Sequence, residues 1–204
     1  MARPREFDRD EVLDTAIGLF WQKGYGGTSM RDVVEATGVN PGSLYAVFEG
    51  KAGLFAEAVE RYASGSFGKR LLAAPADASV VDLLRRAFAD LVREGAGAGG
   101  ARGCLLTNTV AELATREPAI VARVAANMAI LEDDLARRLA RAKRRGEIGA
   151  HVRPRAMARF LLAVIQGIRV TARVSPERRV LGDIAAEALA RLDAGTVDYG
   201  TTVQ

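Results

Sequence analysis

The sequence predicts an all-α protein. Apolar residues recur at helical spacing along nearly the whole chain, and no stretch alternates between apolar and polar residues as a half-buried strand does. Hydrophobic residues make up 49% of the 204 residues and charged residues 26%, a balance that supplies a core and excludes a disordered chain. The length suits one or two domains.

Several classes of protein are disfavoured by the composition. No run of about 18 apolar residues predicts a membrane-spanning helix. The basic N-terminus is not followed by an apolar stretch, so we expect no secretory signal. The single cysteine, Cys104, and the single histidine, His151, favour a reducing cytoplasm and offer neither a disulfide nor a metal site. With no nucleophile–base set or phosphate loop, we expect no enzyme activity, cofactor or metal.

The first helix is marked at both ends. Asp8 is a good N-cap, and Phe7 can pack on Val12 as a hydrophobic staple. Gly24 follows the last apolar residues of the stripe, where a left-handed residue ends a helix. The sequence therefore predicts a helix from about residue 9 to residue 23.

Two short helices follow, and their connection is typical of a helix-turn-helix. Ser29 opens the first of them, and the turn Gly38–Asn40 separates it from the second. Asn40 and Pro41 open this second helix, which runs to about Phe48. A helix presented in this way can enter a DNA major groove, which is roughly 12 Å wide. A fourth helix is expected from Lys51 to about Leu72.

Longer helices are predicted towards the C-terminus, the first of them capped by Ser79. The segment Gly95–Gly103 is rich in glycine and has no large apolar side chain, so we expect a flexible break there. Further helices are expected over residues 103–115, 118–145, 154–173 and 176–193. The resulting division is a helix-turn-helix domain over residues 1–52, a helical domain over 53–195 and a flexible tail over 196–204.

The overall charge is poor support for DNA binding. The net charge is +4, yet residues 1–55 carry six Lys or Arg and eight Asp or Glu, a local net charge of −2. The excess of cations lies further along, notably over residues 137–145, where we expect hydrated side chains that favour the helix dipole. A nucleic-acid function therefore depends on the motif.

The motif resembles the DNA-binding signature of the TetR family over about residues 8–55. The residues that carry the resemblance are Phe20–Tyr25, Thr28–Val34, Ala36–Tyr45, Phe48 and Lys51. The resemblance implies that the helix from Asn40 to Phe48 enters the major groove. It also implies that two C-terminal helices form a homodimer.

The resemblance also implies residue roles in binding double-stranded DNA. Thr28 and Lys51 would bind backbone phosphates, and Tyr45 would contact a phosphate or a thymine methyl group. Taken alone, Tyr45 and Phe48 are also suited to a helical core, and Lys51 to a solvated surface.

Base contacts are implied for residues around the start of the recognition helix. Asn40, Gly42 and Ser43 would lie nearest the bases, with Arg31 as a further contact. Arg3 and Arg5 either reach a neighbouring minor groove or carry idle charges.

Polar residues that interrupt the C-terminal apolar stripes are candidates for binding a small-molecule inducer. They are Cys104, Thr107, Asn108, Asn127 and Gln166. The alternative is that they face water or hydrogen-bond locally. The segment Arg102–Thr109 is similar to one in a TetR subgroup, some members of which respond to electrophiles or oxidants through the matching cysteine. A thiol at a helix N-terminus is a better nucleophile, whereas a lone cysteine also packs as a small hydrophobe.

The dimer interface is expected on the last two helices. Candidate contacts are Ala158, Leu162, Ile184, Ala188 and Leu192, which equally suit the core of one chain. Two-fold symmetry then predicts a roughly palindromic operator. These features favour a ligand-responsive repressor that leaves its operator when an inducer binds. The alternatives are an activator, or a helical protein-binding adaptor without sequence-specific DNA binding.

Overall fold

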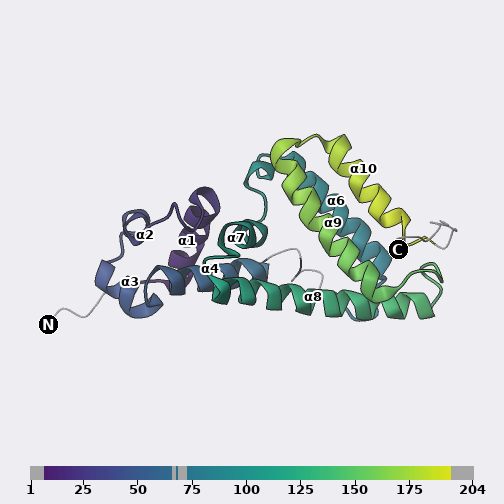
Figure 1. Cartoon of the computed structure of the whole chain (residues 1–204), viewed down its shortest axis with the longest axis horizontal. Helices are drawn as coiled ribbons and strands as arrows, with labels where there is room; N and C mark the ends of the chain where they lie inside the picture. Colours follow the sequence, from purple (N-terminus) through teal and green to yellow (C-terminus); the bar gives the residue numbers. More distant parts are fainter. Residues whose placement is uncertain (1–6, 66–67, 69–72, 194–204) are drawn as a thin grey trace. The chain divides into compact units, whose positions relative to one another are not determined.

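The computed structural model describes residues 7–65, 68 and 73–193 (Figure 1). Within these residues every regular element is a helix, joined by turns and loops, which confirms the all-α prediction. The helices in chain order are α1 (Arg9–Lys23), α2 (Met30–Thr37), α3 (Pro41–Phe48), α4 (Lys51–Gly65), α6 (Val80–Ala96), the 3-10 helix η1 (Gly100–Arg102), α7 (Leu105–Leu113), α8 (Pro118–Arg144), α9 (Pro154–Val174) and α10 (Arg178–Ala190). None of them, over the part of the chain described, combines the length and the hydropathy needed to cross a bilayer.

The chain divides into two compact units. The N-terminal unit contains residues 1–69 and 104–128, and the C-terminal unit contains residues 70–103 and 129–204. The helix-turn-helix domain expected over residues 1–52 therefore shares its unit with α4, α7 and the beginning of α8. Residues 1–6, which include Arg3 and Arg5, and residues 194–204, which include the expected tail, lie outside the described residues.

The three N-terminal helices begin with the caps that the sequence predicts. The Asp8 side chain accepts hydrogen bonds from the backbone at the start of α1. Ser29 and Asp32 form a reciprocal capping box at α2, and the Asn40 side chain accepts from Gly42 N–H at α3. Gly38 ends α2 with φ +67°, a conformation that other residues rarely adopt. These local interactions fix the ends of both helices of the motif.

The core of the N-terminal unit is built from large apolar side chains of α1, α3 and α4. Leu44 and Phe48 of α3 are almost fully buried, which confirms the core alternative for Phe48. Phe20 and Phe55 meet edge to face with ring centroids 4.7 Å apart. Leu105 of α7 joins the same cluster, so α7 shares a hydrophobic core with the DNA-binding motif.

In the C-terminal unit, α6, α9 and α10 pack side by side (Figure 1). The glycine-rich segment is not the flexible break that the sequence suggested. Gly95 is a buried residue of α6, where a Cβ atom would lie 2.9 Å from Leu181 Cδ1 and 3.2 Å from Ala172 Cβ. A Cβ atom on Gly100 would lie 1.9 Å from the carbonyl oxygen of Gly95. These glycines are needed for close packing.

The arginines near the end of α8 also differ from expectation, because they bind the backbone of a loop. Arg138 is only 7% exposed and donates to the carbonyls of residues 74 and 75 at 2.8 and 2.9 Å, and to Asp134 at 2.6 Å. Arg141 and Arg145 donate to the next two carbonyls. A guanidinium has enough donors to satisfy carbonyls that lack a helical partner, so these side chains hold residues 74–77 in place.

Candidate nucleic-acid interface

The second helix of the motif, α3, presents a continuous exposed face. Leu44 and Phe48 point into the core, while Pro41, Gly42 and Ala46 are exposed. Tyr45 is 53% exposed, which rules out the core alternative for this residue. The same buried anchors that fix α3 therefore leave a face of the helix open to a macromolecule.

The residues expected nearest the bases lie at the start of α3. Asn40 and Gly42 are exposed and Ser43 is partly buried. The side-chain oxygen Oδ1 of Asn40 accepts from Gly42 N–H at 2.8 Å, so its cap function leaves the side-chain amide nitrogen as the group able to donate to a base. Arg31 is exposed on α2.

Thr28 does not fit the phosphate contact expected for it. The side chain is 1% exposed, and its hydroxyl donates to the carbonyl of Gly24 at 2.8 Å. It therefore stabilises the turn between α1 and α2. The exposed hydroxyl at this helix end belongs to Ser29, which the sequence identified as a cap and not as a DNA contact.

Lys51 lies at the start of α4 against an aromatic ring. Its ammonium nitrogen is 4.2 Å from the ring centroid of Tyr25, a cation–π distance, and the lysine is partly buried. The ring of Tyr25 packs in turn on Phe55, with centroids 4.9 Å apart. Burial and the nearby Glu117 carboxylate raise the pKa of the Tyr25 hydroxyl. Lys51 is thus held in place, in contrast to a fully solvated lysine.

A contact that the sequence did not predict joins α7 to the turn after α1. The carboxylate of Glu112 accepts from the backbone N–H of Tyr25 at 2.9 Å and from that of Gly26 at 2.6 Å. The two partners are more than eighty positions apart in the chain, and no local pattern marks such a pair. In the sequence, the glycines on each side of Tyr25 are the feature that best hints at this contact.

The expected sensing residues fall into two groups. Cys104 is buried at the start of α7, where its sulfur accepts from the Tyr62 hydroxyl at 3.9 Å. Thr107 and Asn108 follow it as partly buried residues of α7. The Asn127 amide donates to a backbone carbonyl of its own helix at 3.2 Å, and Gln166 is a residue of α9 in the C-terminal unit.

The predicted dimer contacts are mostly part of the core of the chain itself. Ala158, Ala188 and Leu192 are at most 1% exposed, and Leu162 is also buried. Ile184 alone among them keeps partial exposure. Their helical spacing correctly predicted a buried face, but that face packs inside the same chain and not against a second copy. The dimer assignment is therefore wrong for the four buried residues.

A different face of α9 is both exposed and apolar. Val170 is 52% exposed and Val174 is 84% exposed. Ala163 and Gly167 lie on the same face, because the spacings from 163 to 167, 170 and 174 follow helical turns. Exposed branched side chains grouped in this way form a candidate interaction surface.

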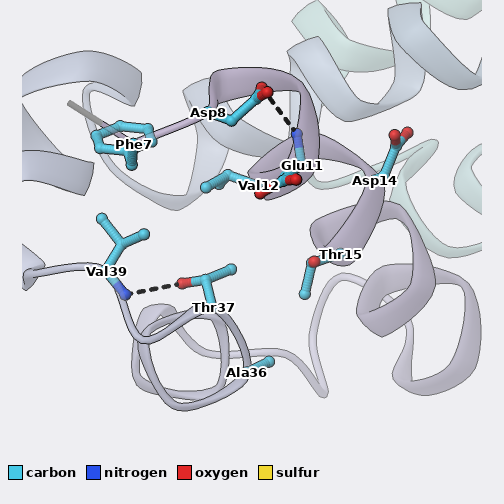
Figure 2. Close-up of a pocket in the computed structure, with 9 residues that line it drawn as sticks. All are labelled: Phe7, Asp8, Glu11, Val12, Asp14, Thr15, Ala36, Thr37 and Val39. Atoms are coloured by element: carbon cyan, nitrogen blue, oxygen red, sulfur yellow. Dashed lines mark hydrogen bonds between the residues drawn. The ribbon is translucent and has the colours of Figure 1, made fainter.

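A cavity of about 650 Å³ lies between the start of α1 and the end of α2 (Figure 2). Its lining includes the carboxylates of Asp8, Glu11 and Asp14. Asp8 caps α1, and Asp14 pairs with Arg61, which lowers the pKa of that carboxyl. Carboxylates in the lining are unfavourable to phosphate, so we assign no DNA contact to this cavity. In the part of the chain described, no three metal-ligating side chains come together.

Two family models match the chain. One, described as "Bacterial regulatory proteins, tetR family", covers residues 12–58, and the other, "Tetracyclin repressor-like, C-terminal domain", covers residues 81–188. The chain is 35% identical to the HTH-type transcriptional repressor ComR of Escherichia coli over 92% of this chain and 90% of that protein. It is 30% identical to the HTH-type transcriptional regulator YezE of Bacillus subtilis, over 95% of this chain and 100% of YezE.

Solved structures have the same fold. A cysteine mutant of the regulator CifR in complex with 26-bp operator DNA superposes with a TM-score of 0.79 at 28% identity, covering 94% of this chain and 100% of CifR. The reduced form of NemR from E. coli has a TM-score of 0.81 at 19% identity, covering 93% of this chain and 98% of NemR, a likeness of fold. The match extends over both units and not only over the helix-turn-helix.

Proposed function

Because the chain belongs to the TetR family of bacterial transcriptional regulators, we propose that it is a cytoplasmic repressor that binds a palindromic operator as a homodimer. The observation that carries the proposal is the exposed face of α3, which is anchored from behind by Leu44 and Phe48. The similar repressor ComR and the operator complex of CifR support the same function. Neither points to an enzyme.

The proposed DNA contacts follow from exposure. Asn40, Gly42, Ser43 and Tyr45 read the bases from α3, and Arg31 contacts DNA from α2. The described part of α3 carries no Arg or Lys, so direct readout relies on hydroxyl and amide groups and on apolar contact with thymine methyl groups.

The proposed phosphate contacts are Lys51 and the start of α2. The exposed Ser29 replaces the buried Thr28 at the N-terminus of α2. Its hydroxyl and backbone N–H already donate to Asp32, so a phosphate there would bind through the helix dipole and the other N–H groups of the first turn. Lys51 supplies a full positive charge at the start of α4. Few cations at the interface imply a shallow dependence of affinity on salt.

The proposed dimer uses the exposed face of α9 formed by Ala163, Gly167, Val170 and Val174. The occupant is a second copy of the chain, because the family model for the C-terminal region covers this helix and the operator is expected to be two-fold symmetric. Small residues at 163 and 167 let the partner helix approach closely. Two recognition helices would then lie about 34–36 Å apart, as successive major grooves require.

The proposed inducer binds the helices that follow the helix-turn-helix, over residues 53–195, and favours a conformation that does not fit the operator. Cys104 is the candidate for a reactive sensor, with Thr107 and Asn108 beside it on α7. Cys104 is only 6% exposed, so an electrophile reaches its thiol when the start of α7 opens. A noncovalent inducer would act on the same helix.

The test is selection of DNA from a random library by the purified chain, at stated salt concentrations, followed by footprinting. We expect an inverted repeat whose protection requires a higher protein concentration in Tyr45→Ala and in Lys51→Ala. Arg179→Ala is the matched control, because Arg179 is 82% exposed in the other unit and has only a loose ion pair at 3.7 Å. If no sequence is enriched at any salt concentration, the repressor proposal fails and a helical adaptor becomes the better explanation.

A further inference from the structure

We propose that Glu112 of α7 is a positioning residue that sets the phosphate-binding geometry of Lys51 through Tyr25. The inference rests on the proposed function, because it assigns a residue far from the DNA-binding face to the same operator contact. Glu112, Tyr25 and Lys51 all belong to the N-terminal unit.

The first contact is a carboxylate clamp on the turn that follows α1. The helix ends at Lys23, so the N–H groups of Tyr25 and Gly26 have no carbonyl within the helix to bind. The two oxygens of Glu112 accept one hydrogen bond from each, at 2.9 and 2.6 Å. Charge-assisted bonds of this kind are short and strong, and a paired acceptor fixes the orientation of the peptide.

The sequence of the turn is suited to the clamp. Gly24 has φ +75°, and a Cβ atom there would lie 2.8 Å from a Glu112 oxygen. A Cβ atom on Gly26 would lie 3.2 Å from the other oxygen. Small residues on both sides of Tyr25 therefore leave room for the carboxylate to reach the backbone.

The second contact is between the ring of Tyr25 and Lys51. The ring is wedged against Phe55, and its face lies 4.2 Å from the Lys51 ammonium nitrogen. The negative face of an aromatic ring attracts a cation and restricts where the flexible lysine chain can go. Clamping the Tyr25 backbone thus determines where the positive charge of Lys51 is presented.

The position of the clamp gives it a regulatory consequence. Cys104 and Glu112 lie at opposite ends of α7. At the N-terminal end of α7 the Tyr62 hydroxyl donates to the Cys104 sulfur. The Tyr62 ring packs edge-on against Trp21 of α1, with centroids 5.0 Å apart. A displacement of α7 by an inducer would therefore pull on the turn that supports Lys51.

Simple electrostatics predicts the opposite result for a mutation of Glu112, and this separates the proposal from a generic charge effect. Removing a carboxylate reduces repulsion of phosphate, so Glu112→Gln would strengthen DNA binding if only net charge mattered. If Glu112 positions Lys51, the same substitution weakens binding. One backbone N–H of the turn then faces the amide nitrogen of the substituted side chain in place of an acceptor oxygen.

The experiment is operator binding by fluorescence anisotropy over a range of salt concentrations, for the full chain, Glu112→Gln, Lys51→Ala and the double variant. We expect Glu112→Gln and Lys51→Ala each to lower the affinity by roughly fivefold to tenfold near 0.1 M salt and to reduce the salt slope by about 0.9. The double variant should be no weaker than Lys51→Ala alone. Glu117→Gln is the control, because its carboxylate is 3.5 Å from the hydroxyl of the same tyrosine but does not bind the turn.

Two results would overturn the proposal: unchanged or tighter binding by Glu112→Gln, or losses that multiply in the double variant. If Glu112→Gln does not fold, Gly26→Ala replaces it, since its Cβ atom presses on the clamp from an exposed position. An unchanged salt slope in Gly26→Ala would equally refute the proposal. Failure of the unaltered chain to bind any operator is a separate result that refutes the proposed function.

Discussion

Replacing Arg138 with alanine tests whether the buried arginine of α8 holds the loop at residues 74–77. The variant removes the guanidinium that donates to the backbone carbonyls of residues 74 and 75, at 2.8 and 2.9 Å, and to the Asp134 carboxylate at 2.6 Å. Removing one partner of a buried ion pair costs about 3–5 kcal/mol, and each net hydrogen bond to a charged group contributes about 1.5–3 kcal/mol. Asp134 keeps some solvent exposure, so we expect a loss of about 3 kcal/mol in the free energy of unfolding.

For a chain of this length, each kcal/mol shifts the melting temperature by about 2–4 °C, so Arg138→Ala should melt about 6–12 °C lower. The assay is thermal unfolding followed by circular dichroism. Arg137→Ala is the control: Arg137 binds the same aspartate at 3.4 Å but is 66% exposed, and surface pairs contribute at most about 1 kcal/mol. A melting temperature for Arg138→Ala within about 2 °C of that of Arg137→Ala would refute the assigned role of the buried guanidinium.

Three further outcomes are expected. Val170→Glu should halve the mass measured by light scattering, because it places a charge in the proposed dimer face. Ile130→Glu, at a similarly exposed position of α8, should leave the mass unchanged. An intact Val170→Glu dimer would exclude this face. Cys104→Ser should abolish release of operator DNA by N-ethylmaleimide, and retained release would end the sensor role. Hydrogen bonds from Lys23 and Ser29 hold the pKa of Asp32 well below its usual range, so its stabilisation is present above the unfolded-state pKa and lost as pH falls. Asp32→Asn should therefore be less stable than the unaltered chain in urea at pH 7, and a difference that persists undiminished in strong acid would contradict this assignment.

The sequence predicted the parts of the fold that depend on neighbours along the chain. The caps at Asp8, Ser29 and Asn40 and the turn at Gly38 are local interactions within a few residues, and each forms as expected. Helical periodicity likewise identified the buried faces of the longer helices. The family resemblance over about residues 8–55 added the role of α3, which periodicity alone does not provide.

The parts that sequence reasoning missed depend on contacts between distant residues. Glu112 and Tyr25, and Arg138 and the loop at 74–77, each pair positions more than sixty residues apart. Periodicity shows that a residue is buried but not which chain covers it, so it does not distinguish the core positions of Ala158 and Ala188 from dimer contacts. Glycine composition was likewise ambiguous, since glycine permits both flexible loops and the close packing observed at Gly95.

The shared core of the N-terminal unit constrains how a signal can reach the operator. Leu105 of α7 packs in the same cluster as Leu44 and Phe48, which anchor the recognition helix. An inducer shifts the equilibrium only by its difference in affinity between two conformations. If α7 moves between the two conformations, part of the inducer's difference in binding free energy must offset the cost of disturbing this core and the Glu112 clamp. Mutations that loosen the clamp should therefore weaken operator binding and also reduce the further effect of an inducer, because both act on the same turn at Tyr25.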